Sequence, residues 1–312
     1  MSRSALRVAV IGVGHLGRHH ARLLASLDGA ALTHVVDTDA DRAKAAAQAT
    51  GAQALQDYRE VLDRVDAVTV AVPTELHREI AMPFLERGIG VLVEKPMARS
   101  LDEADALLNA ARASGATLAV GHTERYNPAI AAILPHVTTP RFIEVHRLGA
   151  FPDRSLDIDV VFDLMIHDLD VILSLVKSDV AAIEAVGVPV LTPRYDIANA
   201  RLRFENGCIA NVTASRISRE RVRKIRFFQP DAYISIDYAA QEVEGWRLAR
   251  RPGERPAIEG GPLPVARQEP LARELADFVA ACRDRRLPLV TGDDGRRALA
   301  LAQAIADKME SV

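Results

Sequence analysis

The feature that most constrains the fold is a strand-like run that leads into three spaced glycines and then a helical pattern. Residues 6–13 read LRVAVIGV, and such an unbroken β-branched apolar run is typical of a strand buried on both faces of a parallel sheet. Gly12, Gly14 and Gly17 spell GVGHLG, and leucines spaced by three or four residues continue to Leu27. The order strand, glycine turn, helix predicts the start of a doubly wound α/β domain.

The glycine turn predicts a dinucleotide site. One glycine permits the tight turn, one lets the backbone approach a pyrophosphate, and one lets helix and strand pack closely. The start of the helix offers N–H groups and a partial positive charge to the phosphates. We therefore expect the turn, with His15 and Leu16, to contact the cofactor. A purely structural glycine turn is the alternative.

The end of the second strand indicates which dinucleotide is bound. The apolar run 31–36 ends at Asp37, 20 residues after Gly17. A carboxylate at this place accepts hydrogen bonds from the adenosine ribose hydroxyls and repels a 2′-phosphate. Thr38, which follows, brings no positive charge. The sequence therefore favours NAD over NADP.

The strand–helix pattern recurs, as in a doubly wound parallel sheet. Further apolar runs cover 67–72, 90–93 and 117–120. Ligands bind at the carboxyl ends of such strands. Five residues at or just after these ends are therefore candidates for cofactor contact: Pro73, Thr74, His77, Glu94 and Lys95.

The triplet Glu94-Lys95-Pro96 is the most specific of these candidates. A lysine that faces a nicotinamide from a strand end could donate a hydrogen bond to a substrate hydroxyl and lower its pKa. Pro96 fixes the backbone that aims the lysine. A surface Lys–Glu pair explains the same residue types equally well.

Length and composition narrow the possible functions. At about 150 residues per domain, 312 residues predict about two domains. With 39 Lys+Arg and 42 Asp+Glu, the net charge of −3 argues against a general nucleic-acid binder. No stretch approaches the roughly 18–20 apolar residues of a membrane span, and the N-terminus does not fit a signal peptide. We expect a cytoplasmic protein with neither nucleic-acid nor membrane partners.

No metal site is predicted. Two cysteines, Cys208 and Cys282, are too few for a disulfide framework or a cysteine metal site. His15 and the pair His19–His20 fall on the turn and the first helix. Surface positions explain these histidines better than metal ligation.

After Gly121 the pattern changes to alternating strands. They begin near Arg141, and Asn206-Gly207 between two of them is a strong hairpin signal. The strands pair locally and one clear helix intervenes, which predicts an α+β domain with one large, mostly antiparallel sheet. Three segments complete this expectation: loops over 245–270, and helices over 270–282 and 291–306.

The intervening helix, residues 161–176, carries a polar stripe beside its apolar one. The members of the stripe are spaced by three or four residues: Asp163, His167, Asp170 and Ser174. A carboxylate one helical turn from a histidine fixes its tautomer and raises its basicity, as a general base requires. Three interpretations stay open: a catalytic pair, a buried structural pair, and a metal site that lacks an evident fourth ligand.

Two further polar clusters are candidates for substrate contact. The first is either a cleft segment or a solvated linker, and its members are His122, Glu124, Arg125, Tyr126 and Asn127. The second is either a solvated strand or a site for a phosphate-bearing substrate, and its members are Arg219, Arg221, Arg223, Lys224 and Arg226.

GVGHLG, Asp37, VPTELHREIA and VLVEKPMA, in this order, resemble the glucose–fructose oxidoreductase, inositol dehydrogenase and MocA family. The resemblance extends from about residue 6 to about residue 306. It implies an NAD-binding Rossmann domain over 1–121 and a substrate and oligomerisation domain over 122–312. It also implies C-terminal helices packed on the Rossmann domain and a homodimer or homotetramer formed through the large sheet.

The resemblance assigns roles to the candidate residues. It implies that Lys95 is catalytic and contacts the cofactor. It also implies that His167 of a D-x-x-x-H motif is the acid/base, supported by Asp163, and that His122, Arg125, Tyr126 and Asn127 meet the substrate. Many members have glycines just before the aspartate. This chain has Asp157, Asp159 and Val160 there, which puts the substrate assignment in doubt.

We therefore expect an NAD-dependent dehydrogenase that oxidises a secondary hydroxyl of a sugar or sugar nucleotide. GHTERYNP and DLMIHDLD are most similar to the forms in family members that oxidise UDP-N-acetylglucosamine to its 3-keto form, on the way to the 2,3-diamino sugars of lipid A. A dehydrogenase of a free sugar or inositol is the alternative. A non-catalytic NAD-binding sensor is the alternative from another class.

Overall fold

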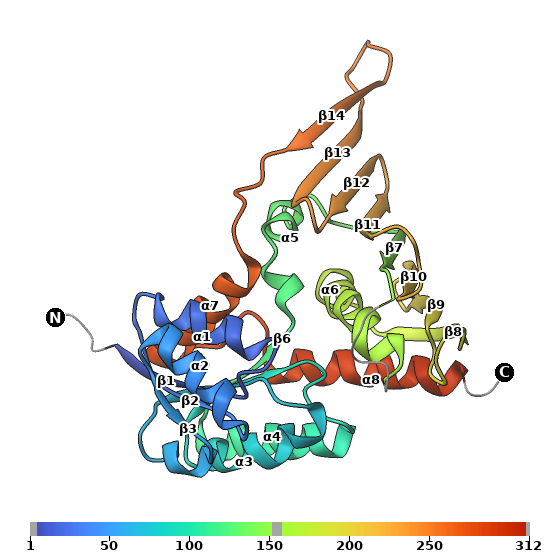
Figure 1. Ribbon diagram of the computed structural model, residues 1–312. Helices are drawn as coiled ribbons and strands as arrows, with labels where there is room; N and C mark the ends of the chain where they lie inside the picture. The colour runs from blue at the N-terminus through green and yellow to red at the C-terminus, as the bar shows by residue number, and fades with distance from the viewer. Residues whose placement is uncertain (1–4, 152–157, 310–312) are drawn as a thin grey trace. The chain divides into compact units, whose positions relative to one another are not determined.

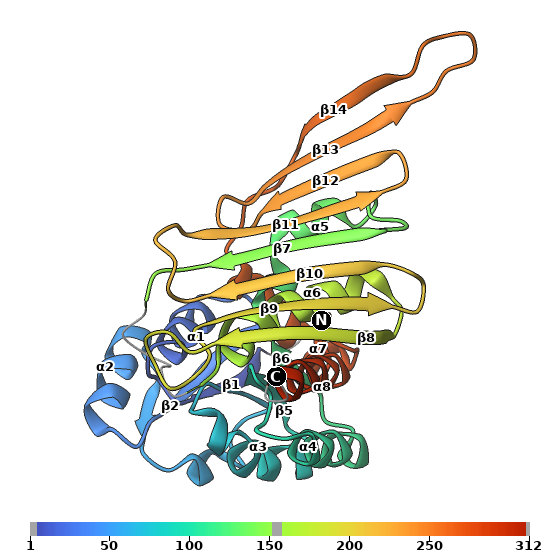
Figure 2. The ribbon, with the colours of Figure 1, turned by 90° about the vertical axis from the view of Figure 1, so that its right-hand side faces the viewer.

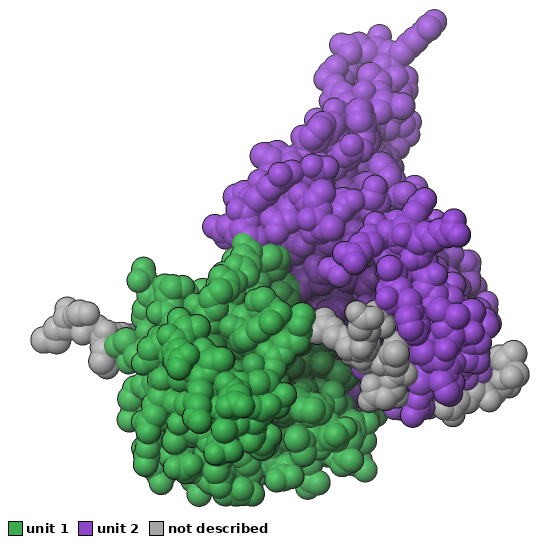
Figure 3. Space-filling view, viewed as in Figure 1, with its two compact units in different colours: residues 1–123, 269–296 green, residues 124–268, 297–312 purple. Residues whose placement is uncertain are grey.

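The computed structural model describes residues 5–151 and 158–309, and this part of the chain divides into two compact units (Figure 3). Unit 1 comprises residues 1–123 and 269–296, and unit 2 comprises residues 124–268 and 297–312. The sequence predicted one division, after residue 121. In the structure the chain passes from unit 1 to unit 2 after Thr123, and residues 269–296 belong to unit 1.

Unit 1 is built on a parallel sheet with six described strands in the order β3-β2-β1-β4-β5-β6 (Figure 1). The strand order reverses direction on either side of β1, so the glycine turn leaves the sheet at its switch point. The strands are β1 (Leu6–Ile11), β2 (Ala30–Val36), β3 (Gln53–Leu55), β4 (Ala67–Val70), β5 (Gly90–Glu94) and β6 (Leu118–Gly121).

Helices cover the sheet of unit 1. The described helices are α1 (Gly17–Ala25), α2 (Ala40–Thr50), α3 (His77–Glu86), α4 (Leu101–Ser114) and α7 (Pro270–Asp284). Leu24 of α1 and Phe278 of α7 are fully buried and join Val8 and Val10 of β1 in one core. The C-terminal helix α7 is thus part of the Rossmann unit. This confirms the doubly wound parallel sheet that the glycine turn predicted.

Unit 2 is built on one large sheet with eight described strands in the order β14-β13-β12-β11-β7-β10-β9-β8 (Figure 2). Only the β7–β10 pair is parallel among the described pairs, so the sheet is mostly antiparallel, as predicted. The strands are β7 (Phe142–Leu148), β8 (Val180–Val188), β9 (Ile197–Phe204), β10 (Ile209–Ser215), β11 (Val222–Gln229), β12 (Ala232–Asp237), β13 (Glu242–Ala249) and β14 (Ala257–Leu263).

The two faces of this sheet differ. On the inner face, alternate residues such as Val145 and Ile225 are fully buried in a core with Leu169 and Ile305. Leu169 and Ile305 belong to α6 (Ile166–Val176) and α8 (Gly292–Met309), and the short α5 (Pro128–Ile133) also contributes to this core. The outer face carries partly exposed side chains such as Trp246.

The structure differs from two expectations about the C-terminal third. Residues 242–263 form the hairpin β13–β14 rather than loops, because the glycines there let two strands approach closely. A Cβ on Gly260 would lie 2.0 Å from the Gly245 carbonyl oxygen. In addition, α8 begins in unit 1, but from Arg297 onward it belongs to unit 2, whose core its apolar residues enter.

Within the described residues, we find no helix long and apolar enough to cross a membrane. Both cysteines, Cys208 and Cys282, are free thiols, and burial raises their pKa values to about 11 and about 12.

Candidate active site

The glycine turn of unit 1 leaves room for a ligand at one of its three glycines. Gly12 has φ +84°, and a Cβ there would lie 2.6 Å from the Ala71 carbonyl oxygen. A Cβ on Gly17 would lie 1.7 Å from the Gly12 carbonyl oxygen. A Cβ on Gly14, by contrast, would meet no heavy atom within 4 Å. Close contacts with neighbouring backbone atoms explain why positions 12 and 17 are glycines, whereas Gly14 faces open space.

The start of α1 also fits a pyrophosphate. Its N-cap, Leu16, makes no side-chain capping hydrogen bond, and the first turn holds no acidic residue. The backbone N–H groups there are the donors that phosphate oxygens accept from at a helix N-terminus. The open position at Gly14 and the uncapped helix start together leave room and hydrogen-bond donors for a pyrophosphate.

Gly14→Ala is expected to leave folding intact and to weaken NAD binding roughly tenfold, because the added methyl group occupies space that the pyrophosphate needs. Fluorescence titration with NAD and a thermal melt measure the two effects. The control is Gly12→Ala, which is expected to destabilise the fold because of its positive φ and the contact with Ala71. Unchanged NAD affinity in Gly14→Ala would contradict this assignment.

Asp37 lies directly after β2 with its carboxylate turned toward the glycine turn. One oxygen, Oδ2, accepts from Val13 N at 3.0 Å, and Oδ1 accepts from Asp39 N at 3.0 Å and from Arg42 Nη2 at 2.9 Å. Burial alone would raise the pKa of Asp37, but these hydrogen bonds outweigh it and hold the pKa below its usual value. The carboxylate is therefore ionised and fixed. Arg42 is a cation beside it that our sequence analysis missed.

Glu94 turns inward from the end of β5 and bonds to a histidine of α1. Its Oε1 lies 3.0 Å from His20 Nε2, and both side chains are buried. Burial would raise the pKa of Glu94, but the hydrogen bond and charge of His20 lower it. His20 was predicted to lie on the surface, and this prediction is wrong because the buried face of α1 includes it. Lys95, next in the chain, is partly exposed between buried neighbours, and the Lys95–Pro96 peptide bond is cis.

His77 links the segments that follow β4 and β5. Its Nδ1 lies 3.0 Å from the Pro96 carbonyl oxygen and its Nε2 lies 3.0 Å from the Val72 carbonyl oxygen. Burial lowers the pKa of His77. Both ring nitrogens of His77 thus lie within hydrogen-bond distance of backbone carbonyl oxygens, and the side chain supports the turn that carries Lys95. Pro73 and Thr74, between these segments, are exposed and partly exposed.

The segment that follows β6 is a buried polar network rather than a solvated linker. His122 is 1% exposed and Asn127 is 2% exposed. Asn127 caps α5 by accepting from Ala129 N at 3.0 Å, and its amide donates to the Tyr238 carbonyl oxygen at 3.1 Å. Tyr126 is buried as well. The polar groups of Asn127 therefore serve the fold of unit 2.

The helix with the D-x-x-x-H motif begins in a π-helical turn. Residues Val161–Met165 form this turn, and α6 continues from Ile166. Asp163 and His167 therefore lie on opposite sides of the junction, and both are partly exposed. Sequence periodicity predicted one continuous α-helix, and π-helical turns often mark functional sites. Asp159 and Val160 precede the turn, whereas Asp157 lies outside the described residues.

Two buried ion pairs hold α6 in place. Asp168 receives a bidentate contact from Arg147 of β7, at 2.6 Å and 3.0 Å. Asp170 lies 3.2 Å from Nη1 of Arg125. Burial alone would lower the pKa of Arg147, but the charges of Asp168 and Glu124 raise it. Because Asp168 and Asp170 closely follow His167 on the helix, these pairs fix how the helix is turned about its axis.

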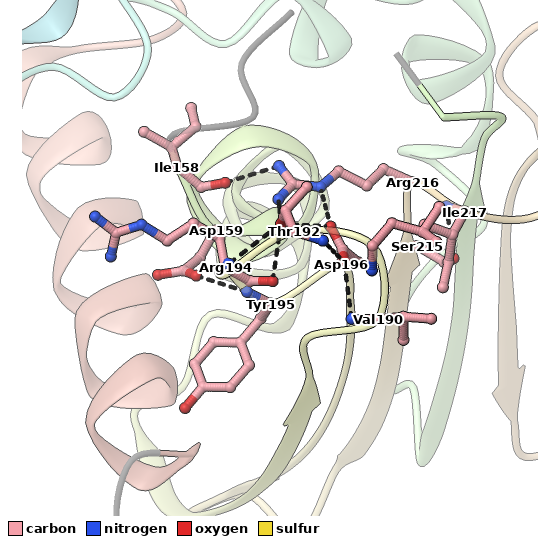
Figure 4. Close-up of polar contacts among 11 residues, drawn as sticks. Ile158, Asp159, Val190, Thr192, Arg194, Tyr195, Asp196, Ser215, Arg216 and Ile217 are labelled. Carbon is pink, nitrogen blue, oxygen red and sulfur yellow. Dashed lines mark hydrogen bonds and ion pairs between the residues drawn. The ribbon is translucent and has the colours of Figure 1, made fainter. Parts of the chain in front are cut away.

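A third polar cluster anchors the start of this helix (Figure 4). Arg216 is fully buried and donates to Asp196 Oδ1 at 2.8 Å, to Thr192 Oγ1 at 2.9 Å and to the Ile158 carbonyl oxygen at 2.7 Å. Asp196 Oδ2 accepts three successive backbone N–H groups, those of Val190, Leu191 and Thr192. We call Arg216 and Asp196 the Asp196–Arg216 clamp.

The clamp reaches the π-helical turn through the residues before it. Tyr195 N donates to Asp159 Oδ1 at 2.9 Å, and Val160 N donates to the Tyr195 carbonyl oxygen at 3.0 Å. The Asp159 carbonyl oxygen then accepts from Asp163 N at 3.1 Å. Asp159, an acidic residue just before the motif, is therefore part of the support for Asp163.

Known proteins match both units. A family model described as an oxidoreductase family with an NAD-binding Rossmann fold matches residues 6–122, and the model of the GFO/IDH/MocA C-terminal domain matches residues 137–234. UDP-N-acetylglucosamine 3-dehydrogenase of Acidithiobacillus ferrooxidans is 38% identical over 98% of both chains. The NAD-dependent scyllo-inositol 2-dehydrogenase of Bacillus subtilis is 30% identical over 68% of both chains.

Solved structures agree. A structure of the Acidithiobacillus ferrooxidans enzyme superposes with a TM-score of 0.93, at 37% identity and over 99% of both chains. A levoglucosan dehydrogenase in complex with NADH and levoglucosan has the same fold, with a TM-score of 0.89 at 20% identity, covering 99% of this chain and 98% of that one.

Proposed function

The chain belongs to the GFO/IDH/MocA oxidoreductase family, and from this premise we propose that it oxidises the 3-hydroxyl of UDP-N-acetylglucosamine. It is an NAD-dependent dehydrogenase that acts on a CH–OH group. The observation that supports this substrate is the similarity to a relative with that activity, which is 38% identical over 98% of both chains. The matched inositol dehydrogenase aligns over only 68%.

The reaction converts a secondary alcohol and NAD⁺ to a ketone, NADH and a proton. We assign His167 as the base that takes the hydroxyl proton and Lys95 as the donor that stabilises the developing alkoxide charge. Asp163 orients His167. When bound, NAD would supply the acceptor for the hydride that leaves the carbon. On the protein side, Gly14, the start of α1 and Asp37 would hold the cofactor.

The test is direct oxidation by the purified protein. With NAD and UDP-N-acetylglucosamine, we expect NADH absorbance to rise, at a rate well above that with N-acetylglucosamine or inositol. Turnover of inositol or a free sugar alone would replace the proposed substrate with the alternative. NAD binding without turnover of any of the three would favour a sensor.

The same proposal places the reaction in the cytoplasm, at the step that supplies a 3-keto sugar nucleotide for the 2,3-diamino sugars of lipid A. It also assigns the outer face of the large sheet to a homodimer or homotetramer contact. Phe142, Phe228 and Tyr233 form a row there with ring centroids 5.6 Å and 5.2 Å apart, and Trp246 pairs in register with Tyr233. Light scattering that gives a monomer at micromolar concentration would contradict the assembly.

A further inference from the structure

We propose that Arg223 of β11 binds the diphosphate of the sugar-nucleotide substrate. This inference rests on the proposed function and names the residue that would make the site prefer a nucleotide-linked sugar. The sequence left the basic cluster around Arg223 undecided between a solvated surface and a phosphate site. The structure separates the three members that lie in β11, namely Arg223, Lys224 and Arg226, by the face of the sheet that each one occupies.

The alternation of β11 places Arg223 on the inner face and its basic neighbours on the outer face. Ile225 and Phe227, in phase with Arg223, are fully buried in the core with α6. Lys224 and Arg226, out of phase, have partners on neighbouring strands. Arg226 Nη1, for instance, lies 2.6 Å from a carboxylate oxygen of Glu144. Arg223 itself is exposed, so the covered part of the inner face ends at this residue.

Several buried arginines of unit 2 are already bound to carboxylates. Arg147 pairs in register with Arg223 and is held by Asp168 and Glu124. Arg125 forms an ion pair with Asp170, and Arg216 forms one with Asp196. In the described part of the chain, no carboxylate lies within ion-pair distance of the Arg223 guanidinium. An exposed guanidinium without a carboxylate is available for bidentate binding of phosphate oxygens.

Arg223 also lies near the catalytic helix. Burial raises the pKa of Asp168, and Arg147 and Arg223 are the two cations that oppose this shift. Arg223 is therefore within electrostatic range of the residue that follows His167 in the chain. A diphosphate bound at Arg223 would belong to the same ligand whose sugar hydroxyl meets His167.

Tyr238, whose backbone bonds to that of Arg223, carries a buried hydroxyl within electrostatic range of Asp168 and Glu124. Tyr238 N donates to the Arg223 carbonyl oxygen at 2.9 Å. The Tyr238 side chain is 3% exposed, and its hydroxyl has no hydrogen-bond partner among the described residues. Burial raises the pKa of Tyr238, so the hydroxyl keeps its proton and remains a donor. Buried hydroxyls rarely stay unpaired, and a ligand oxygen would supply the partner.

The experiment compares Arg223→Gln with the matched control Arg226→Gln, which changes the neighbouring arginine of the same strand on the opposite face. UDP is the binding probe, measured by calorimetry with NAD present, and UDP-N-acetylglucosamine is the substrate. In Arg223→Gln we expect the UDP Kd and the substrate KM to rise roughly tenfold or more, with kcat within about threefold and NAD affinity unchanged. Arg226→Gln should stay within about twofold of wild type.

The outcomes separate this inference from the proposed function. Wild type that oxidises UDP-N-acetylglucosamine, while Arg223→Gln keeps the wild-type UDP Kd, overturns the inference alone. Wild type that neither binds UDP nor oxidises its sugar derivative overturns the proposed function and the inference with it. Recovery of most of the UDP affinity in Arg223→Lys would support a charge contact, because lysine keeps the charge but not the bidentate geometry.

Discussion

Replacing His167 with alanine is expected to lower kcat by about 10²–10⁴-fold, the usual contribution of a positioned general base. The substrate hydroxyl would keep its proton as the hydride leaves, so the barrier rises at the chemical step. NAD affinity should stay within about twofold of wild type, because the glycine turn and Asp37 that would hold NAD belong to unit 1 and His167 belongs to unit 2. Steady-state NADH formation and an NAD titration measure the two quantities.

Ser174→Ala is the matched control for this prediction. Ser174 lies on the same helix and on the polar stripe, and its hydroxyl donates to the Val171 carbonyl oxygen within α6. Its loss should leave kcat near wild type. Lys95→Ala is expected to lower kcat to a similar extent as His167→Ala. Substantial turnover in His167→Ala would remove His167 from the role of base and leave Lys95 as the candidate.

The fold could be predicted where a short stretch of sequence requires one particular backbone conformation. The run into Gly12 predicted β1, the turn and α1, and Asn206-Gly207 predicted the β9–β10 hairpin, whose Gly207 has φ +84°. The same reasoning gave a wrong prediction around Gly260, which was expected in a loop, because this glycine allows strands β13 and β14 to approach closely. A glycine in sequence does not distinguish a turn from such an approach.

The sequence predicted which residues at strand ends and on one helix are candidates for the site. It did not predict which side chains form hydrogen bonds or ion pairs with one another. Helical spacing does not say which side of α1 is buried, so His20 was read as a surface residue although it bonds to Glu94. Asp168 pairs with Arg147 of β7, and Asp196 pairs with Arg216, which directly follows β10; the partners are 21 and 20 residues apart in the sequence. Such pairs carry no short-range signal, because only the folded sheet brings them together.

Arg216→Ala is expected to lower the free energy of unfolding by about 3–5 kcal/mol, the usual cost of removing one partner from a buried ion pair. The loss leaves the buried Asp196 carboxylate without its cation and the Ile158 carbonyl oxygen without its donor. Urea unfolding measures the change. Arg203→Ala, which removes an exposed arginine of β9, is the control and should stay within about 0.5 kcal/mol of wild type.

The pH dependence of Asp196→Asn tests the same clamp from its acidic side. Burial alone would raise the pKa of Asp196, but its backbone hydrogen bonds and Arg216 hold the pKa far below its usual value. A lowered folded-state pKa stabilises the fold above the unfolded-state pKa, about 3.9, and this contribution is lost as the pH falls further. The stability difference between wild type and Asp196→Asn should therefore be constant near neutral pH and shrink below about pH 4. A difference that persists unchanged in acid would show that the charge of Asp196 contributes nothing, and that the clamp stabilises the start of the catalytic helix by shape alone.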